Sequence, residues 1–218
     1  MALDDILARI AQAEQNAGRA PGSVTLIAVS KVQPLARVEA ALEAGQRVFG
    51  ENYVQEAAGK WPDLRARFPG VQVHMIGPLQ TNKAKVAVDL FDAIQTLDRP
   101  SLAEKLARLA GARGKCPDLF VQVNTGSEPQ KGGVLPEDAD GFLRDCRTMG
   151  LSLAGLMCIP PEGADPSSDF RLLRSMAEAH GIPGLSMGMS ADFETAITMG
   201  ATHVRIGSAI FGARGAAA

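Results

Sequence analysis

The stretch VTLIAVSKVQPLARVEAALEAG, residues 24 to 45, contains the unit from which the fold is predicted. Its first part is a near-continuous apolar run, which is typical of a strand buried on both faces of a parallel sheet. Its second part has apolar residues at helical spacing and ends at Gly45, where a helix C-cap favours glycine. Lys31, at the end of the strand, is either a solvated residue at the rim of the sheet or an amine held for imine formation.

The same strand-and-helix unit recurs along the chain. Eight apolar runs are present, namely VTLIAVS (24 to 30), QRVFGEN (46 to 52), VQVHMIG (71 to 77), DAIQTLD (92 to 98), DLFVQVN (118 to 124), LSLAGLMCI (151 to 159), GLSMGMS (184 to 190) and THVRIGS (202 to 208). Helical patterns occupy 34–45, 82–91, 101–114, 137–150 and 169–181, and a further helix is expected at 3–17. Strands that alternate with helices indicate a parallel sheet, and eight units of this length fit a small (β/α)8 TIM barrel of eight parallel strands.

A doubly wound open sheet is the alternative architecture. The glycine-rich nucleotide-binding motifs of such sheets follow none of the apolar runs, so the barrel is favoured. No linker rich in Ser, Gly or Pro divides the chain, and residues 1–218 are therefore predicted to form a single domain. The segment IPPEGADPSSD, 159–169, is predicted to be a long loop on the functional rim.

Composition excludes several classes of function. A net charge of -2 with mixed signs argues against a nucleic-acid or polybasic membrane surface. The N-terminus lacks the pattern of a signal peptide and no apolar run is long enough to span a membrane, so a cytoplasmic protein is expected. The three cysteines form no CxxC pair and the three histidines have no ligand spacing, so neither a disulfide framework nor a metal site is predicted.

The last two predicted strands end in residues suited to a phosphate group. Ser186, Gly188 and Ser190 end the seventh run, and Gly207 and Ser208 end the eighth. Barrels often hold phosphate with the loops after these two strands, where backbone N–H groups and hydroxyls converge. Ordinary helix capping is the alternative explanation, and it explains Ser190 as an N-cap without any ligand.

Arg205 completes a set of groups that suits pyridoxal 5'-phosphate (PLP). It alternates with apolar residues in the eighth run, where it is either a partner in a salt bridge at the rim or a donor aimed into the site. A guanidinium is always charged, so it would keep a pyridine nitrogen unprotonated. PLP needs an amine for its aldehyde, donors for its phosphate and a partner for its ring nitrogen. Lys31, the phosphate-binding turns and Arg205 supply these three.

The chain resembles the pyridoxal phosphate homeostasis protein family, single-domain proteins similar to the N-terminal barrel of alanine racemase. The motifs that carry the resemblance are AVSKVQP (28–34), FGENYVQE (49–56), HMIGPLQTNK (74–83), EPQKGG (128–133), GLMCIP (155–160), LSMGMSADFETAI (185–197) and VRIGSAIFGAR (204–214). The resemblance implies that Lys31 forms an internal aldimine, a Schiff base, with PLP. It further implies that Asn52 lies beside the ring hydroxyl, that Arg205 faces the ring nitrogen, and that the phosphate is held by Ser186, Ser190, Gly207 and Ser208.

A role in PLP (vitamin B6) homeostasis without appreciable catalysis is expected. A racemase needs two bases on opposite faces of the substrate carbon, and the C-terminal β domain that supplies the second base in alanine racemase has no counterpart in this sequence. The single tyrosine, Tyr53, is interpreted as a packing or rim residue. No catalytic residue is therefore assigned. A weak PLP-dependent amino-acid racemase and, from another class, an aldolase that forms an imine through its lysine are the alternatives.

Three further residues have two interpretations each. Lys83 and Lys131 lie in resembling motifs, and are either a solvated rim or a second phosphate or transient cofactor site. Cys158 is either a reactive thiol or a small buried apolar residue. Besides PLP, the expected partners are apo-enzymes that receive the cofactor, and the protein is expected to be a monomer that binds neither nucleic acid nor membrane.

Overall fold

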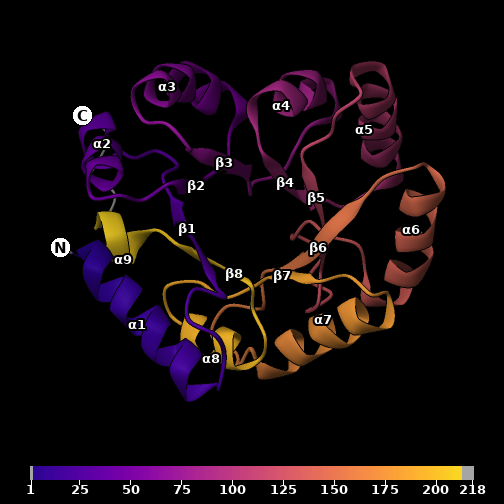
Figure 1. Ribbon diagram of the computed structural model, residues 1–218. Helices are drawn as coiled ribbons and strands as arrows, with labels where there is room; N and C mark the ends of the chain where they lie inside the picture. Colours follow the sequence, from indigo (N-terminus) through magenta and orange to yellow (C-terminus); the bar gives the residue numbers. More distant parts are fainter. Residues whose placement is uncertain (1, 213–218) are drawn as a thin grey trace.

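Figure 1 shows the computed structural model, which describes residues 2–212, as a ring of helices around a closed ring of strands. The strands follow chain order around the barrel, and the parallel pairing of β1 with β8 closes it. They are β1 (Thr25–Val29), β2 (Val48–Glu51), β3 (Gln72–Met75), β4 (Ala93–Leu97), β5 (Asp118–Val123), β6 (Leu153–Cys158), β7 (Gly184–Ser186) and β8 (His203–Ile206). The predicted (β/α)8 barrel is confirmed.

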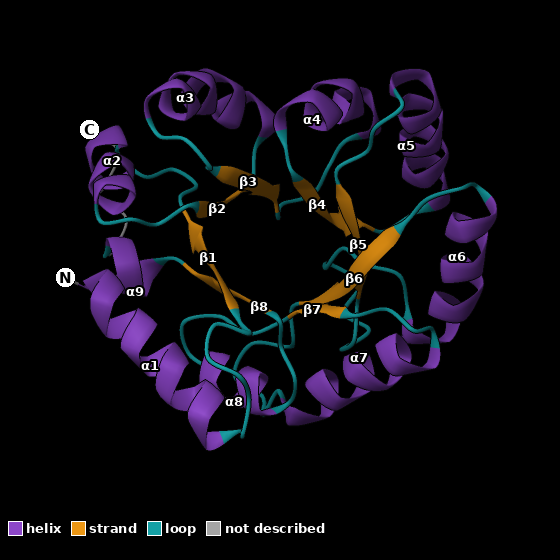
Figure 2. Ribbon diagram, in the orientation of Figure 1, coloured by secondary structure: helices purple, strands orange, loops and turns teal. Residues whose placement is uncertain are grey.

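Helices separate the strands and cover the outside of the barrel (Figure 2). They are α1 (Ala2–Asn16), α2 (Leu35–Glu43), α3 (Val54–Arg67), the short 3₁₀ helix η1 (Thr81–Lys83), α4 (Ala84–Leu90), α5 (Pro100–Arg113), α6 (Pro136–Thr148), α7 (Ser167–Ala179), α8 (Phe193–Thr198) and α9 (Ser208–Phe211). No helix within residues 2–212 has both the length and the apolar character needed to cross a membrane.

The extra N-terminal helix is joined to the first strand by one buried carboxylate. Glu14 of α1 is 2% exposed and accepts hydrogen bonds from the backbone N–H of Gly22 at 3.0 Å and of Val24 at 2.7 Å. The Ser23 hydroxyl also donates to it, at 3.2 Å. A carboxylate that accepts several backbone N–H bonds is a strong anchor, so Glu14 fixes where the chain enters β1.

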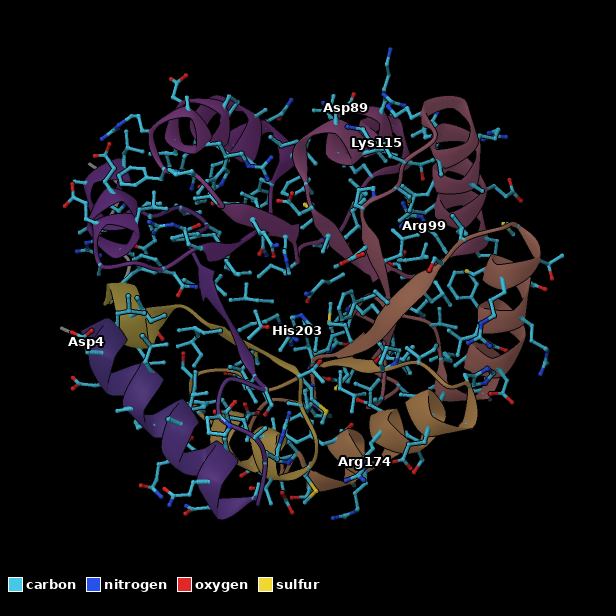
Figure 3. All side chains as sticks on the ribbon, viewed as in Figure 1. Asp4, Asp89, Arg99, Lys115, Arg174 and His203 are labelled. Carbon is cyan, nitrogen blue, oxygen red and sulfur yellow. The ribbon has the colours of Figure 1, made fainter. Side chains whose placement is uncertain are left out.

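The apolar core is divided unequally between two places. The larger cluster fills the layer between strands and helices, whereas a small one, Ala93, Phe120 and Met157, lies apart from it. The interior of a TIM barrel is usually filled with branched apolar side chains. Here buried polar side chains from four strands occur instead, on His74, Gln95, Ser186 and Arg205. Figure 3 places the labelled His203 toward the middle of the ring of strands.

Some predicted boundaries were wrong. The helix predicted after β7 begins at Phe193, and its N-cap residue is Asp192 rather than Ser190. The chain turns away from the sheet at Gly188, whose φ of 91° is readily adopted only by glycine, and the helix therefore starts later. Helix α3, between β2 and β3, received no bounds from the sequence, and Pro62 lies inside it. The predicted domain bounds extend to residue 1 and residues 213–218, outside the described part of the chain.

Candidate functional site

Five predicted site residues come together at the carboxyl ends of strands β1, β7 and β8. A cavity of about 200 Å³ is lined by Val29, Lys31, Gln33, Met189, Ser190, Arg205, Gly207, Ser208 and Gly212. It therefore brings together a primary amine, a guanidinium, two hydroxyls and a glycine turn, although these groups are far apart in the sequence. This set of donors suits an anionic ligand that also carries a carbonyl group.

Asn52 lies in a second cavity, after β2 and β3. That cavity, of about 270 Å³, is lined by Asn52, Tyr53, Val54, Gln55, Met75, Pro78, Gln80 and Lys83. Gly77 fixes the turn that carries Asn52, because a Cβ atom at position 77 would lie 2.5 Å from the Asn52 carbonyl oxygen and 2.6 Å from its Cα. Tyr53 is 57% exposed at the rim of this cavity. Lys83 is therefore near Asn52, and it does not line the cavity that contains Lys31.

Arg205 is a buried cation held by uncharged groups. It is 4% exposed, and its guanidinium donates to the Ser186 hydroxyl at 2.7 Å and to the Cys158 carbonyl oxygen at 2.8 Å. Within residues 2–212 no carboxylate lies within ion-pair distance of it. Burial lowers its pKa from the usual value, while Cys158 and Asp192 raise it. A buried charge requires compensation, so an anion in the adjoining cavity would complete this site.

Ser186 lies beneath the cavity and does not line it. Its side chain is fully buried, accepts from Arg205 and donates to Gln95 Oε1 at 2.6 Å. Gln95 Nε2 in turn lies 3.1 Å from His74 Nδ1. An arginine only donates, and this fixes the direction of every hydrogen bond in the series. Arg205 donates to Ser186, Ser186 to Gln95, and Gln95 to His74. We refer to these four residues as the Arg205 chain.

The Arg205 chain ends on a neutral histidine. Burial, together with the neighbouring His203, lowers the pKa of His74 to about 3. Burial, together with Arg205, also lowers the pKa of His203, to about 4. His74 Nδ1 therefore remains an unprotonated acceptor at neutral pH, as the direction of the chain requires.

The hydroxyl of Ser190 is available to a ligand. Asp192 Oδ1 accepts from the Met189 backbone N–H at 2.6 Å, and the Ser190 side chain makes no capping bond to α8. Across β8, Gly207 is the N-cap residue of α9, and Ser208 is its first residue. The structure therefore removes helix capping as the explanation for Ser190.

Lys131 is held by structural partners, and Cys158 is a buried thiol. Lys131 Nζ donates to the Pro160 carbonyl oxygen at 2.9 Å and pairs with Glu128, which joins the loops after β5 and β6. Burial raises the pKa of the Cys158 thiol to about 12, so at neutral pH this cysteine is a protonated, buried group rather than a reactive thiolate. Within residues 2–212 no cluster of three or more His, Cys, Asp or Glu side chains is arranged to hold a metal ion.

His74 and Gln95 were not among the predicted site residues, although the sequence contains a signal for them. Each is a polar residue inside an otherwise apolar strand, in VQVHMIG and DAIQTLD. Such residues need a partner when the strand is buried. The partner was not predictable, because Gln95 and Ser186 are 91 residues apart in the chain.

Comparison with known proteins supports this assignment of the fold and identifies the family. The family model for the alanine racemase N-terminal domain matches residues 1–215. The pyridoxal phosphate homeostasis protein of Pseudomonas aeruginosa is 41% identical, over 96% of this chain and 93% of that protein. That of Escherichia coli is 38% identical, over 94% and 92%.

Solved structures give the same result. PipY from Synechococcus elongatus, solved with PLP bound, has a TM-score of 0.79 and 36% identity, and the match covers 93% of this chain and all of PipY. An alanine racemase of Clostridium difficile is 14% identical, with a TM-score of 0.72. That match covers 96% of this chain and 57% of the racemase, and it shows a shared fold alone. The protein is thus a barrel of the alanine racemase N-terminal type. Within that class, the chain belongs to the pyridoxal phosphate homeostasis protein family.

A matched pair of serine substitutions separates the two hydroxyls. Ser186→Ala leaves a buried Arg205 N–H and the Gln95 carbonyl oxygen without a partner, and each unsatisfied group costs about 1–3 kcal/mol. We therefore expect Ser186→Ala to lower the free energy of unfolding by about 2–6 kcal/mol, and Ser190→Ala to change it by less than about 0.5 kcal/mol. Urea unfolding of the ligand-free protein measures both. Equal effects of the two substitutions would contradict the Arg205 chain.

The lowered pKa of His74 makes stability depend on pH. In the unfolded chain His74 is protonated below about pH 6.5, whereas in the folded chain it stays neutral down to about pH 3. Stability conferred by neutral His74 is therefore complete above pH 6.5 and is lost as the pH falls toward 3. Between pH 7 and pH 5 this loss is about 2 kcal/mol. His74→Asn retains an acceptor for Gln95 but cannot bind this proton. We therefore expect its unfolding free energy to fall, between pH 7 and pH 5, by about 2 kcal/mol less than that of the wild type. Identical pH profiles would show that His74 titrates normally.

Proposed function

We propose that this protein binds PLP reversibly through Lys31 and acts in cellular PLP homeostasis. The observation that carries the proposal is the buried guanidinium of Arg205, which has no carboxylate partner within residues 2–212 and lines the same cavity as Lys31. The PLP-bound structure of the relative PipY and the names of the curated relatives support it.

Each group of the cavity has a role in this proposal. The Lys31 amine would hold the cofactor covalently through its aldehyde, with release of one water. When bound, PLP supplies that aldehyde and a pyridine ring able to accept electrons. Arg205 donates toward the ring nitrogen, while the hydroxyls of Ser190 and Ser208 and the backbone at Gly207 bind the phosphate.

Asn52 and Ser186 have different roles in this proposal. Asn52, from the adjacent turn after β2, is proposed to contact the ring hydroxyl. The resemblance implied a phosphate contact for Ser186, but its hydroxyl is fully buried and already bonds Arg205 and Gln95. We therefore assign to Ser186 the positioning of Arg205, with the phosphate left to the residues that line the cavity.

A holding role suits these residues better than catalysis. An arginine at the ring nitrogen keeps it unprotonated, which weakens the ring as an acceptor of electrons. A racemase also needs a second base, and the only tyrosine of the chain, Tyr53, is exposed at the other cavity. The curated relatives are named as homeostasis proteins.

The setting of this role is also part of the proposal. We place the protein in the cytoplasm as a monomer that holds PLP for apo-enzymes. The three cysteines are free thiols, which suits a reducing compartment. Delivery to apo-enzymes would require the covalent bond to Lys31 to be reversible, as bonds between an amine and an aldehyde are in water.

Chemical trapping tests the covalent site. Wild-type protein mixed with PLP should develop a visible absorbance band, and borohydride reduction should fix the label on the peptide that contains Lys31. Lys31→Ala should lose both, because among residues 2–212 no other amine lines the cavity with Arg205. Lys83→Ala and Lys131→Ala are matched controls, and both should label as wild type does.

Two results would contradict the proposal. Label scattered over surface lysines would mean that Lys31 is a residue of the rim. Retention of full PLP affinity in Ser190→Ala and Arg205→Ala would favour the lysine-dependent aldolase, which needs no phosphate site coupled to an arginine.

Isotope exchange tests for catalysis. PLP-loaded protein incubated with L-alanine in deuterium oxide should leave the α-hydrogen unexchanged and form no D-alanine, because Arg205 weakens the ring as an acceptor of electrons. Within residues 2–212, Lys31 is also the only side chain lining the cavity that could act as a base, whereas racemisation needs two. Proton NMR of the amino acid measures this directly. Exchange accompanied by formation of D-alanine, with both lost in Lys31→Ala, would establish the weak racemase instead.

A further inference from the structure

The residues on either side of Lys31 are held by a group of charged side chains that lie outside both cavities. The Ser30 hydroxyl donates to Glu51 Oε1 at 2.6 Å, and Lys60 Nζ donates to the Ser30 carbonyl oxygen at 3.1 Å. Glu51 is fully buried at the end of β2 and accepts also from Trp61 of α3. Ser30, the residue before Lys31, is therefore fixed through both its side chain and its backbone.

Val32, the residue after Lys31, has a strained backbone. Its φ is 55°, in the left-handed region, and Gln33 N–H bonds the Ser30 carbonyl oxygen at 3.3 Å to close the turn. For a β-branched residue this conformation costs about 1–3 kcal/mol and persists only where the surroundings impose it. Packing of the valine does not impose it, because Val32 is 58% exposed.

A hydrogen bond that the Val32 backbone donates to α3 holds the strained conformation. The Val32 backbone N–H donates to Glu56 Oε1 at 2.7 Å. Glu56 is held in turn by Lys60, one helical turn later, whose Nζ lies 3.2 Å from Glu56 Oε1 and 2.6 Å from Glu51 Oε1. Lys60 thus connects the carboxylate that holds Ser30 to the carboxylate that holds Val32.

Stability alone does not account for this arrangement. The side chain of Lys60 is 9% exposed and that of Glu51 is fully buried, and buried ion pairs contribute little net stability because of the cost of desolvation. Burial raises the pKa of Glu51, which Lys60 and Ser30 lower in part. The group therefore buries charge and maintains a strained residue, and the chain segment that it fixes is the one that carries Lys31.

We propose that Glu56 and Lys60 are positioning residues, which hold the turn at Val32 so that the Lys31 amine is presented to the cavity before the cofactor arrives. This inference rests on the proposed function. A turn that is already ordered avoids the entropy of ordering it when the covalent bond forms. Loss of Glu56 would therefore weaken formation of the covalent bond and leave non-covalent binding intact.

Two probes separate these steps. PLP reports the covalent adduct through its visible absorbance, and 4'-deoxypyridoxine phosphate, which lacks the aldehyde, reports non-covalent binding alone. We expect Glu56→Ala to lower the equilibrium constant for adduct formation about 10-fold or more while changing the affinity for the deoxy analogue less than about 2-fold. Glu178→Ala, the loss of an exposed acid on α7, is the matched control.

Two further variants identify the contact. Glu56→Gln retains an oxygen for the Val32 N–H but loses the ion pair with Lys60, and it should stay within about 3-fold of wild type. Adding Val32→Gly to Glu56→Ala should recover part of the lost adduct, because glycine adopts a positive φ without strain. A merely structural role of Glu56 would not predict this rescue.

The outcomes distinguish this inference from the proposed function. Wild-type adduct formation by Glu56→Ala would overturn the inference and leave the site at Lys31 standing. Equal loss of PLP and of the deoxy analogue would also overturn it, because Glu56 would then support the whole pocket. Absence of the adduct in the wild-type protein would instead refute the proposed function.

Discussion

A buried cation without a counter-ion among residues 2–212 is the constraint on which the site depends. Arg205 is buried, and within residues 2–212 it donates to a hydroxyl and to a backbone carbonyl rather than to a carboxylate. A carboxylate partner would have stabilised the charge but cancelled its field at the cavity. With neutral acceptors the orientation is fixed and the positive charge remains effective toward a ligand. The polar interior of the barrel follows from this, because Ser186 needs Gln95 as an acceptor, and Gln95 needs His74.

The two ends of the site are supported by different kinds of interaction. Arg205 requires an undiminished charge, and the groups behind it are a hydroxyl, an amide and a neutral imidazole. Lys31 requires a fixed backbone, and the groups behind its turn are ionic. Charged hydrogen bonds are roughly twice as strong as neutral ones, which suits them to holding Val32 in a left-handed conformation. The carboxylate of Glu56 bonds a backbone N–H, so this support acts on the position of the lysine.

The sequence predicted the parts of the fold that depend on local patterns. Eight apolar runs, each followed by a turn and most by a recognisable helix, were sufficient for the barrel, and Lys31, Ser190, Arg205, Gly207 and Ser208 do line one cavity. The role of Ser186 was not predictable, because its orientation toward Gln95 is set by the closure of the barrel. The turn at Val32 was not predictable either. Nothing in its valine indicates a positive φ, which is imposed by a glutamate 24 residues later.

Both supports bear on whether the bound cofactor is held or used. Burying Arg205 and straining Val32 lower the stability of the protein without ligand. An anionic ligand that bonds Lys31 would recover this stability, because ligand binding stabilises the folded state. Such coupling favours tight but reversible occupancy. Catalysis would require in addition a second base across the substrate carbon and a protonated ring nitrogen. The residues around this cavity supply an amine, a permanent cation and hydroxyl donors, and this set suits the holding role that we propose.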